Sequence, residues 1–175
     1  YKDISVDGEN STVVVKNKLS NWYTDSDSFK QGLGSIVISG GGDAPESAID
    51  ALATAHKLDF RTNAEKFIIL VTDATFKVGN RHGISDMEEM IGLLERDNMM
   101  TSVITSSNLK ATYQELYEQT GGIYGNIYGN FSQELLKIAD NIGENVNEGT
   151  WVLLKDFQAV RLDGEVGSRC DTDKD

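Results

Sequence analysis

Residues 66–72 (KFIILVT) constrain the fold more than any other feature of the sequence. Five successive apolar residues lie between polar ones, which is typical of a short strand buried on both faces, and such strands belong to parallel sheets. Asp73 follows this strand directly. Because ligands of open parallel sheets bind at the carboxyl ends of the strands, Asp73 is a candidate binding residue. The alternative interpretation is an aspartate that only caps a turn.

Predicted helices and strands alternate along the chain. Beside residues 66–72, we expect strands at 1–6, 12–16, 100–105 and 151–160. We expect helices at 29–36 after the N-cap candidates 25–28 (DSDS), at 44–56 with Pro45 in its first turn, after a Ser85–Glu88 capping box, at 112–119 and at 132–142. Residues 124–131, rich in tyrosine, glycine and asparagine, are predicted to form a loop. This order predicts an α/β fold: a doubly wound, mainly parallel sheet flanked by helices in a three-layer sandwich.

Composition excludes several classes of partner and chemistry. Sixteen basic residues against 28 acidic ones give a net charge of −12 without a run of Lys or Arg, so we expect no nucleic acid partner. No stretch approaches the ~18 apolar residues of a membrane span, so we expect no direct membrane insertion. Cys170 is the only cysteine, and no G-x-S-x-G elbow, Walker loop or Cys/His pair is present. The sequence therefore predicts a protein that is not an enzyme and that suits a cation or a basic partner.

Two segments carry a resemblance to a known family. Residues 38–52 (ISGGGDAPESAIDAL) and 67–74 (FIILVTDA) resemble the second and third segments of a von Willebrand factor A domain. In that family, a divalent cation above the sheet is held by a D-x-S-x-S motif, a Thr and an Asp. The resemblance places the Asp at Asp73 and the Thr at Gly42, which offers no side chain. It implies that Asp43 binds the ion directly or through water, as Mg²⁺ or Ca²⁺ prefers carboxylates and water.

The D-x-S-x-S motif is absent from the sequence, since residues 25–28 precede a helix and follow no apolar strand. The resemblance covers most of residues 1–143 and implies that the first strand and helix of the family lie upstream of Tyr1. The position of that strand in the sheet then has to be filled by another segment or by the upstream chain, because an empty slot would expose unpaired backbone.

Other candidate ligand-binding residues surround the same expected edge of the sheet. Gly40 and Gly41 let the backbone approach an ion closely, and Thr75 and His82 belong to the loop that follows Asp73. A domain boundary is expected near Thr150, which separates residues 1–149 from a C-terminal strand and acidic segment at 150–175.

That acidic segment ends in three alternating carboxylates, which we call the tail aspartates: Asp171, Asp173 and Asp175. Their spacing resembles the opening of a thrombospondin type 3-like calcium repeat, which implies metal binding. A solvated acidic tail is the alternative interpretation.

We therefore expect a non-catalytic adhesion or protein-binding module of a secreted or cell-surface protein. It would bind a protein ligand, through an acidic residue of that ligand, by way of Mg²⁺ or Ca²⁺ at the top of the sheet. The alternatives are a Rossmann-like or flavodoxin-like nucleotide-binding enzyme domain, which Asp43 disfavours because it would repel a phosphate, and an intracellular scaffold subunit with the same A-type fold.

Overall fold

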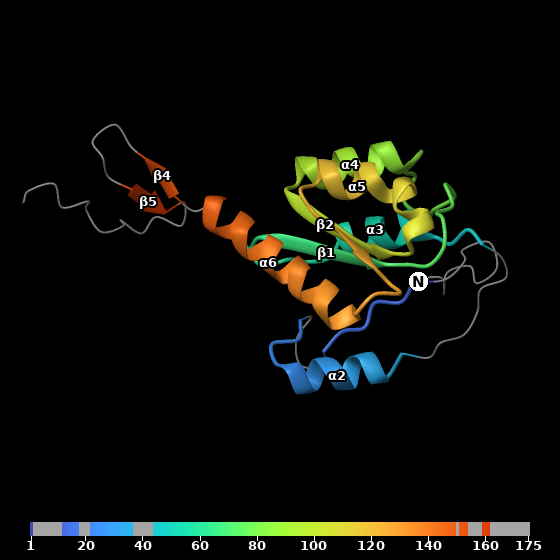
Figure 1. Ribbon diagram of the computed structural model, residues 1–175, viewed down its shortest axis with the longest axis horizontal. Helices are drawn as coiled ribbons and strands as arrows, with labels where there is room; N and C mark the ends of the chain where they lie inside the picture. Colours follow the sequence, from blue (N-terminus) through green and yellow to red (C-terminus); the bar gives the residue numbers. More distant parts are fainter. Residues whose placement is uncertain (2–11, 18–21, 37–43, 150, 154–158, 162–175) are drawn as a thin grey trace, which may run out of the picture.

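The computed structural model describes residues 1, 12–17, 22–36, 44–149, 151–153 and 159–161 (Figure 1). Its central sheet is parallel, with β1 (Lys66–Val71), β2 (Met99–Thr105) and β3 (Tyr124–Asn126) side by side in that order. The protein has an α/β fold of the doubly wound type, as the sequence predicts. The two longer strands, β1 and β2, lie within one residue of their predicted bounds.

One face of the sheet is covered by three consecutive helices: α3 (Ala48–His56), α4 (Met87–Arg96) and α5 (Gln114–Gln119). Two short 3-10 turns, η2 (Ser107–Leu109) and η3 (Ala111–Tyr113), lead from β2 into α5. The largest cluster of buried apolar side chains lies between these helices and the sheet. It includes Leu52, Leu70, Met90, Leu94, Val103 and Leu116.

The opposite face is covered in part by α6 (Phe131–Gly149), which contacts β3 and lies on the other side of the sheet from α4 and α5 (Figure 1). Ile104 is adjacent to Val103 in β2 and therefore points to this face. Ile104 and Ile138 of α6 are both almost fully buried, yet neither belongs to the main cluster. The fold thus has helices on both faces of its parallel sheet.

Helix α2 (Ser26–Gly34) begins three residues before the helix expected at 29–36, and its cap lies among the predicted candidates. Asp25 is its N-cap, and the Asp25 carboxylate accepts a hydrogen bond of 2.8 Å from the Ser28 amide. Residues 25–28 are therefore a cap, as expected from their sequence. The apolar side chains of α2 are not covered within the described part of the chain, since Phe29 and Leu33 are about half exposed.

The predicted helix at 44–56 is wrong at its start. The structure begins α3 at Ala48 with Ser47 as N-cap, and Glu46 instead forms a parallel bridge with Phe76. The Glu46 amide donates to the Thr75 carbonyl at 2.9 Å, and the Glu46 carbonyl accepts from the Lys77 amide at 2.8 Å. Tertiary pairing with the loop after β1 therefore holds this segment extended.

The predicted capping box of α4 is displaced by one residue. Asp86 is the N-cap and accepts from the Glu89 amide at 2.9 Å, while the Glu89 carboxylate accepts from the Ser85 amide at 2.7 Å. Glu89 rather than Glu88 is thus the acidic partner. The pair is not a fully reciprocal capping box, because the Glu89 carboxylate reaches the amide of Ser85 and not that of the N-cap Asp86.

Three further predictions of local structure are wrong. Residues 12–17 form no strand, and Val13 is 68% exposed, so they lack both the pairing and the burial of one. Residues 124–126 are the strand β3 rather than part of a loop. The predicted strand at 151–160 is instead an antiparallel pair, β4 (Trp151–Leu153) and β5 (Ala159–Arg161). The domain boundary near Thr150, which follows the end of α6, stays a prediction.

Several predicted positions lie outside the described residues. They are the strand at 2–6, Gly40, Gly41, Gly42, Asp43 and the tail aspartates.

Candidate cation site at the carboxyl ends of the strands

Asp73 is the first residue beyond the sheet at the carboxyl end of β1. The Thr72 amide still donates to the Ile104 carbonyl of β2 at 3.0 Å, so the ladder extends up to the residue before Asp73. The turn itself is held by Thr72, whose hydroxyl accepts from the Ala74 amide at 3.3 Å. Asp73 is exposed. The Thr72 hydroxyl thus takes part in the turn, and both interpretations of Asp73, as a ligand and as a turn cap, stay predictions.

Glu46 lies at the same edge of the sheet, brought there by its bridge to Phe76. The negative charges of Glu46 and Asp73 both affect the pKa of the Tyr1 hydroxyl. Burial raises the pKa of Tyr1 to about 12, and the negative charges of Glu46 and Asp73 add to this effect, which outweighs a hydrogen bond with Thr72 that lowers it. The charges of Glu46 and Asp73 therefore both act on the same phenol. No local pattern of the sequence indicates this role for Glu46, which suits the first turn of a helix equally well.

Tyr113 fixes the loop that carries this site. Its ring is fully buried, its hydroxyl donates to the Ala74 carbonyl at 2.7 Å, and its edge packs against Phe76 with 5.7 Å between ring centroids. Burial, together with the neighbouring Tyr1, raises the pKa of Tyr113. The hydroxyl therefore stays protonated as a donor at neutral pH. Thr75 contributes its carbonyl to the Glu46 bridge and lies exposed at the surface of the loop.

Two hydroxyls at the end of β2 add oxygen atoms to this edge. The register pairs Val71 with Ile104, so Thr105 and Ser106 follow at the levels of Thr72 and Asp73. The side-chain oxygens of Thr105 and Ser106 are buried and, within the described part of the chain, have no hydrogen-bond partner. Carboxylate and hydroxyl oxygens are the hard ligands that Mg²⁺ and Ca²⁺ prefer. Oxygen atoms of the kind that such an ion binds are therefore present at this edge.

His82, the other candidate from the loop after Asp73, lies elsewhere. Its ring packs along α3, with Nε2 3.0 Å from the Thr54 hydroxyl and Nδ1 2.9 Å from the Lys57 ammonium. Burial and the positive charge of Lys57 lower the pKa of His82. The Asp50 carboxylate lies 3.8 Å from Nε2, on the same nitrogen as Thr54. A hydrolytic triad needs its hydroxyl and carboxylate on opposite ring nitrogens, so this is a structural contact.

Asp50 and Arg81 form an ion pair beside His82 that the sequence did not reveal. The Asp50 side chain is fully buried and accepts from Arg81 Nη2 at 2.7 Å, from the Arg81 amide at 2.9 Å and from the Thr12 hydroxyl at 2.7 Å. The pair ties the loop after β1 to α3. It thereby holds the loop that follows Asp73 against α3.

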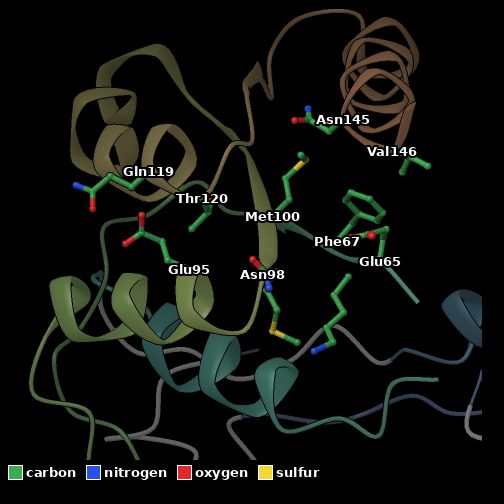
Figure 2. A pocket seen from close by; sticks show the side chains of 11 residues that line it. Glu65, Phe67, Glu95, Asn98, Met100, Gln119, Thr120, Asn145 and Val146 are labelled. Atoms are coloured by element: carbon green, nitrogen blue, oxygen red, sulfur yellow. The ribbon is translucent and has the colours of Figure 1, made fainter. Parts of the chain in front are cut away.

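A separate cavity of about 330 Å³ lies at the other end of the sheet, where β1 and β2 begin (Figure 2). Phe67, Met100 and Val146 line one part of it, while Glu95 and Gln119 lie close together in another. Lys66, also in its lining, donates to the Asp97 carbonyl at 3.3 Å. The cavity has no nucleophile next to a base, and it is remote from Asp73.

Within the described residues, no group of three His, Cys, Asp or Glu side chains has a spacing that would hold a metal ion. Glu46 and Asp73 are thus two carboxylates that need further oxygens to complete a coordination shell. Among the described residues, no helix combines the length and the apolar character that crossing a membrane requires. The chain matches no protein-family model, and no curated protein is significantly similar to it.

Proposed function

We propose that this chain is a non-catalytic protein-binding module of a secreted or cell-surface protein, which binds its ligand through a divalent cation at the carboxyl ends of β1 and β2. Asp73 and Glu46 would hold Mg²⁺ or Ca²⁺, and a carboxylate of the protein ligand would complete its coordination. The observation that supports the proposal is that Glu46 is bridged to Phe76 in the loop after Asp73, and that the charges of Glu46 and Asp73 both act on the Tyr1 hydroxyl.

The charge and rigidity of this edge support the same proposal. Two carboxylates at the same edge of the sheet repel anions, so an acidic ligand gains affinity here only when a cation lies between it and the protein. Both carboxylates are attached to segments that pair with each other, because the Glu46 and Thr75 backbones are hydrogen-bonded at 2.9 Å. Such a pre-organised pair loses little conformational entropy when an ion binds.

The same charges disfavour a nucleotide-binding enzyme. A phosphate at this edge would meet the carboxylates of Glu46 and Asp73 rather than a helix N-terminus free of acidic groups. Residues 40–43 directly precede the described Ala44, so on the resemblance they would supply Asp43 as a further oxygen donor to the proposed ion.

Thermal unfolding with Mg²⁺, with Ca²⁺ and with EDTA tests the proposal. A cation at about 100 times its dissociation constant stabilises the folded state by about 2.7 kcal/mol, which raises Tm by roughly 5–10 °C for a chain of this size. Asp73→Asn and Glu46→Gln are expected to remove this increase. Glu65→Gln, an exposed carboxylate at the other end of β1, is the matched control and is expected to retain it. A Tm that is the same in all three solutions would refute the proposal.

A further inference from the structure

Two buried hydroxyls lie at the carboxyl end of β2, and buried hydroxyls normally have a hydrogen-bond partner. Thr105 is fully buried and Ser106 is 3% exposed, yet neither side-chain oxygen has a partner in the described part of the chain. Burying a hydroxyl without a hydrogen bond lowers the stability of the folded state. Each of the two oxygens therefore requires an explanation.

The usual structural explanation does not apply to Ser106. The residue is the N-cap of η2, a position where a serine side chain commonly accepts a hydrogen bond from a backbone amide of the first turn. Its side chain makes no such bond. The turn is held instead by the Ser106 carbonyl, which accepts from the Leu109 amide at 3.0 Å. The Ser106 hydroxyl therefore does not serve as a cap.

The register of the sheet places Ser106 on the same face as Asp73. Val71 of β1 pairs with Ile104 of β2, and paired residues of neighbouring strands direct their side chains to the same face. Asp73 and Ser106 each follow two residues later, which returns the side chain to that face. The backbone of Ser106 is still extended, with φ −70° and ψ 153°. The carboxylate and the hydroxyl therefore lie on one face, at the ends of adjacent strands.

Thr105 lies on the opposite face. It follows Val103 by two residues, and Val103 belongs to the main apolar cluster beneath α3, α4 and α5. Thr72 alternates with Asp73 in the same way and uses its hydroxyl in the turn to Ala74. Of the two hydroxyls at the end of β2, that of Ser106 is thus the one on the side of Asp73.

We propose that the Ser106 hydroxyl is a ligand of the divalent cation beside Asp73, an inference that rests on the proposed function. Asp73 would bind the ion from the end of β1, Ser106 from the end of β2, and Glu46 from the segment before α3. Mg²⁺ and Ca²⁺ take roughly six to eight oxygen ligands, so positions remain for water and for a carboxylate of the protein ligand. Because the hydroxyl is neutral, it adds a ligand without reducing the attraction of the ion for that carboxylate.

Calorimetric titration of the full chain with Ca²⁺ and with Mg²⁺ tests this assignment. Every variant carries asparagine at the tail aspartates, so that ion binding by the tail does not contribute. Ser106→Ala is expected to bind at least about ten-fold more weakly, since loss even of an outer-shell partner commonly lowers metal affinity by about 10–100-fold. Ser106→Asp supplies a carboxylate in the same place and is expected to bind at least as tightly as the unsubstituted Ser106. Thr105→Val removes the other buried hydroxyl and is the matched control, with unchanged affinity.

Thermal unfolding in EDTA separates a metal ligand from a hydroxyl that holds the fold. Without a cation, Ser106→Ala only removes an unpaired buried polar group, so its Tm is expected to equal or exceed that of the wild type. A Tm well below the wild-type value in EDTA would overturn the proposal, because it would show a structural role. Unchanged affinity for both ions in Ser106→Ala, or equal losses in Ser106→Ala and Thr105→Val, would overturn it as well.

Two results distinguish the role of Ser106 from the proposed function itself. Cation binding that is lost in Asp73→Asn and unchanged in Ser106→Ala removes Ser106 from the site and leaves the proposed function intact. A wild-type chain that binds neither Ca²⁺ nor Mg²⁺ refutes both.

Discussion

Replacing Asp50 by asparagine is expected to lower the free energy of unfolding by about 2 kcal/mol at neutral pH. The buried carboxylate accepts from the Thr12 hydroxyl and from three nitrogens of Arg81, at 2.7–3.2 Å. An amide of the same shape keeps one acceptor and turns donors towards the donors of Arg81. Because Arg81 is 32% exposed and regains some hydration, the expected loss is smaller than the roughly 3–5 kcal/mol for breaking a fully buried pair.

The effect has a defined dependence on pH. Burial alone would raise the pKa of Asp50, but its hydrogen bonds with Arg81 outweigh burial and hold the pKa at about 2, below the ordinary 3.8. A carboxyl with a lowered pKa in the folded state stabilises the fold above its unfolded pKa, and this contribution is lost as pH falls through the folded pKa. The difference between wild type and Asp50→Asn should therefore be constant above pH ~5 and shrink towards pH ~2.

Urea unfolding followed by circular dichroism, at several pH values, measures this difference. Asp59→Asn, a change at an exposed carboxylate, is the control and should alter stability by less than about 0.5 kcal/mol. If Asp50→Asn unfolds at the same urea concentration as wild type at neutral pH, the ion pair does not stabilise the fold. If the difference persists unchanged at low pH, the stabilisation does not come from the ionised carboxylate of Asp50.

The same unfolding assay checks three further predictions. Gly122→Ala should destabilise the fold by at least about 3 kcal/mol or prevent folding, because the new Cβ would lie 2.1 Å from the Thr101 carbonyl oxygen. Gly92→Ala should instead stabilise it by about 0.5–1 kcal/mol, since Gly92 lies inside α4 with nothing near its missing Cβ; a loss of stability would show a contact that the structure lacks. Asp86→Ala should lower the free energy of unfolding by about 1 kcal/mol and Glu88→Ala should leave it nearly unchanged, as only Asp86 caps α4. A larger effect of Glu88→Ala would instead support the Ser85–Glu88 capping box that the sequence predicts.

The strongest local patterns were predictable from the sequence. The apolar run of β1 and the helical periodicity of α4 place their own elements, because apolar residues in a continuous run or at helical spacing are direct signals in residue order. The burial of β1 on both faces is not seen among the described residues, where Ile69 and Val71 are 41% and 42% exposed. β3 leaves no such trace. It has three residues with a glycine at its centre, and it forms because β2 offers an edge and because Gly122 lets the chain approach the Thr101 carbonyl.

The candidate site was predictable in part for the same reason. Asp73 is found from its place directly after a buried strand, which is a local signal. Glu46 is not, because its position depends on a bridge to Phe76, which lies on a different segment of the chain. The ion pair of Asp50 and Arg81, residues 31 apart in the sequence, has no local signature either.

Terbium luminescence tests the central claim most directly, because Tb³⁺ takes hard oxygen sites and is sensitised by a nearby tyrosine. The charges of Glu46 and Asp73 both act on the Tyr1 hydroxyl, so excitation of tyrosine should give Tb³⁺ emission that is lost when Ca²⁺ or Mg²⁺ displaces the ion. We predict that this emission is lost in Asp73→Asn and in Glu46→Gln and retained when all three tail aspartates are changed to asparagine. Full emission in Asp73→Asn, or loss only on changing the tail aspartates, would contradict a cation site at the carboxyl ends of the strands.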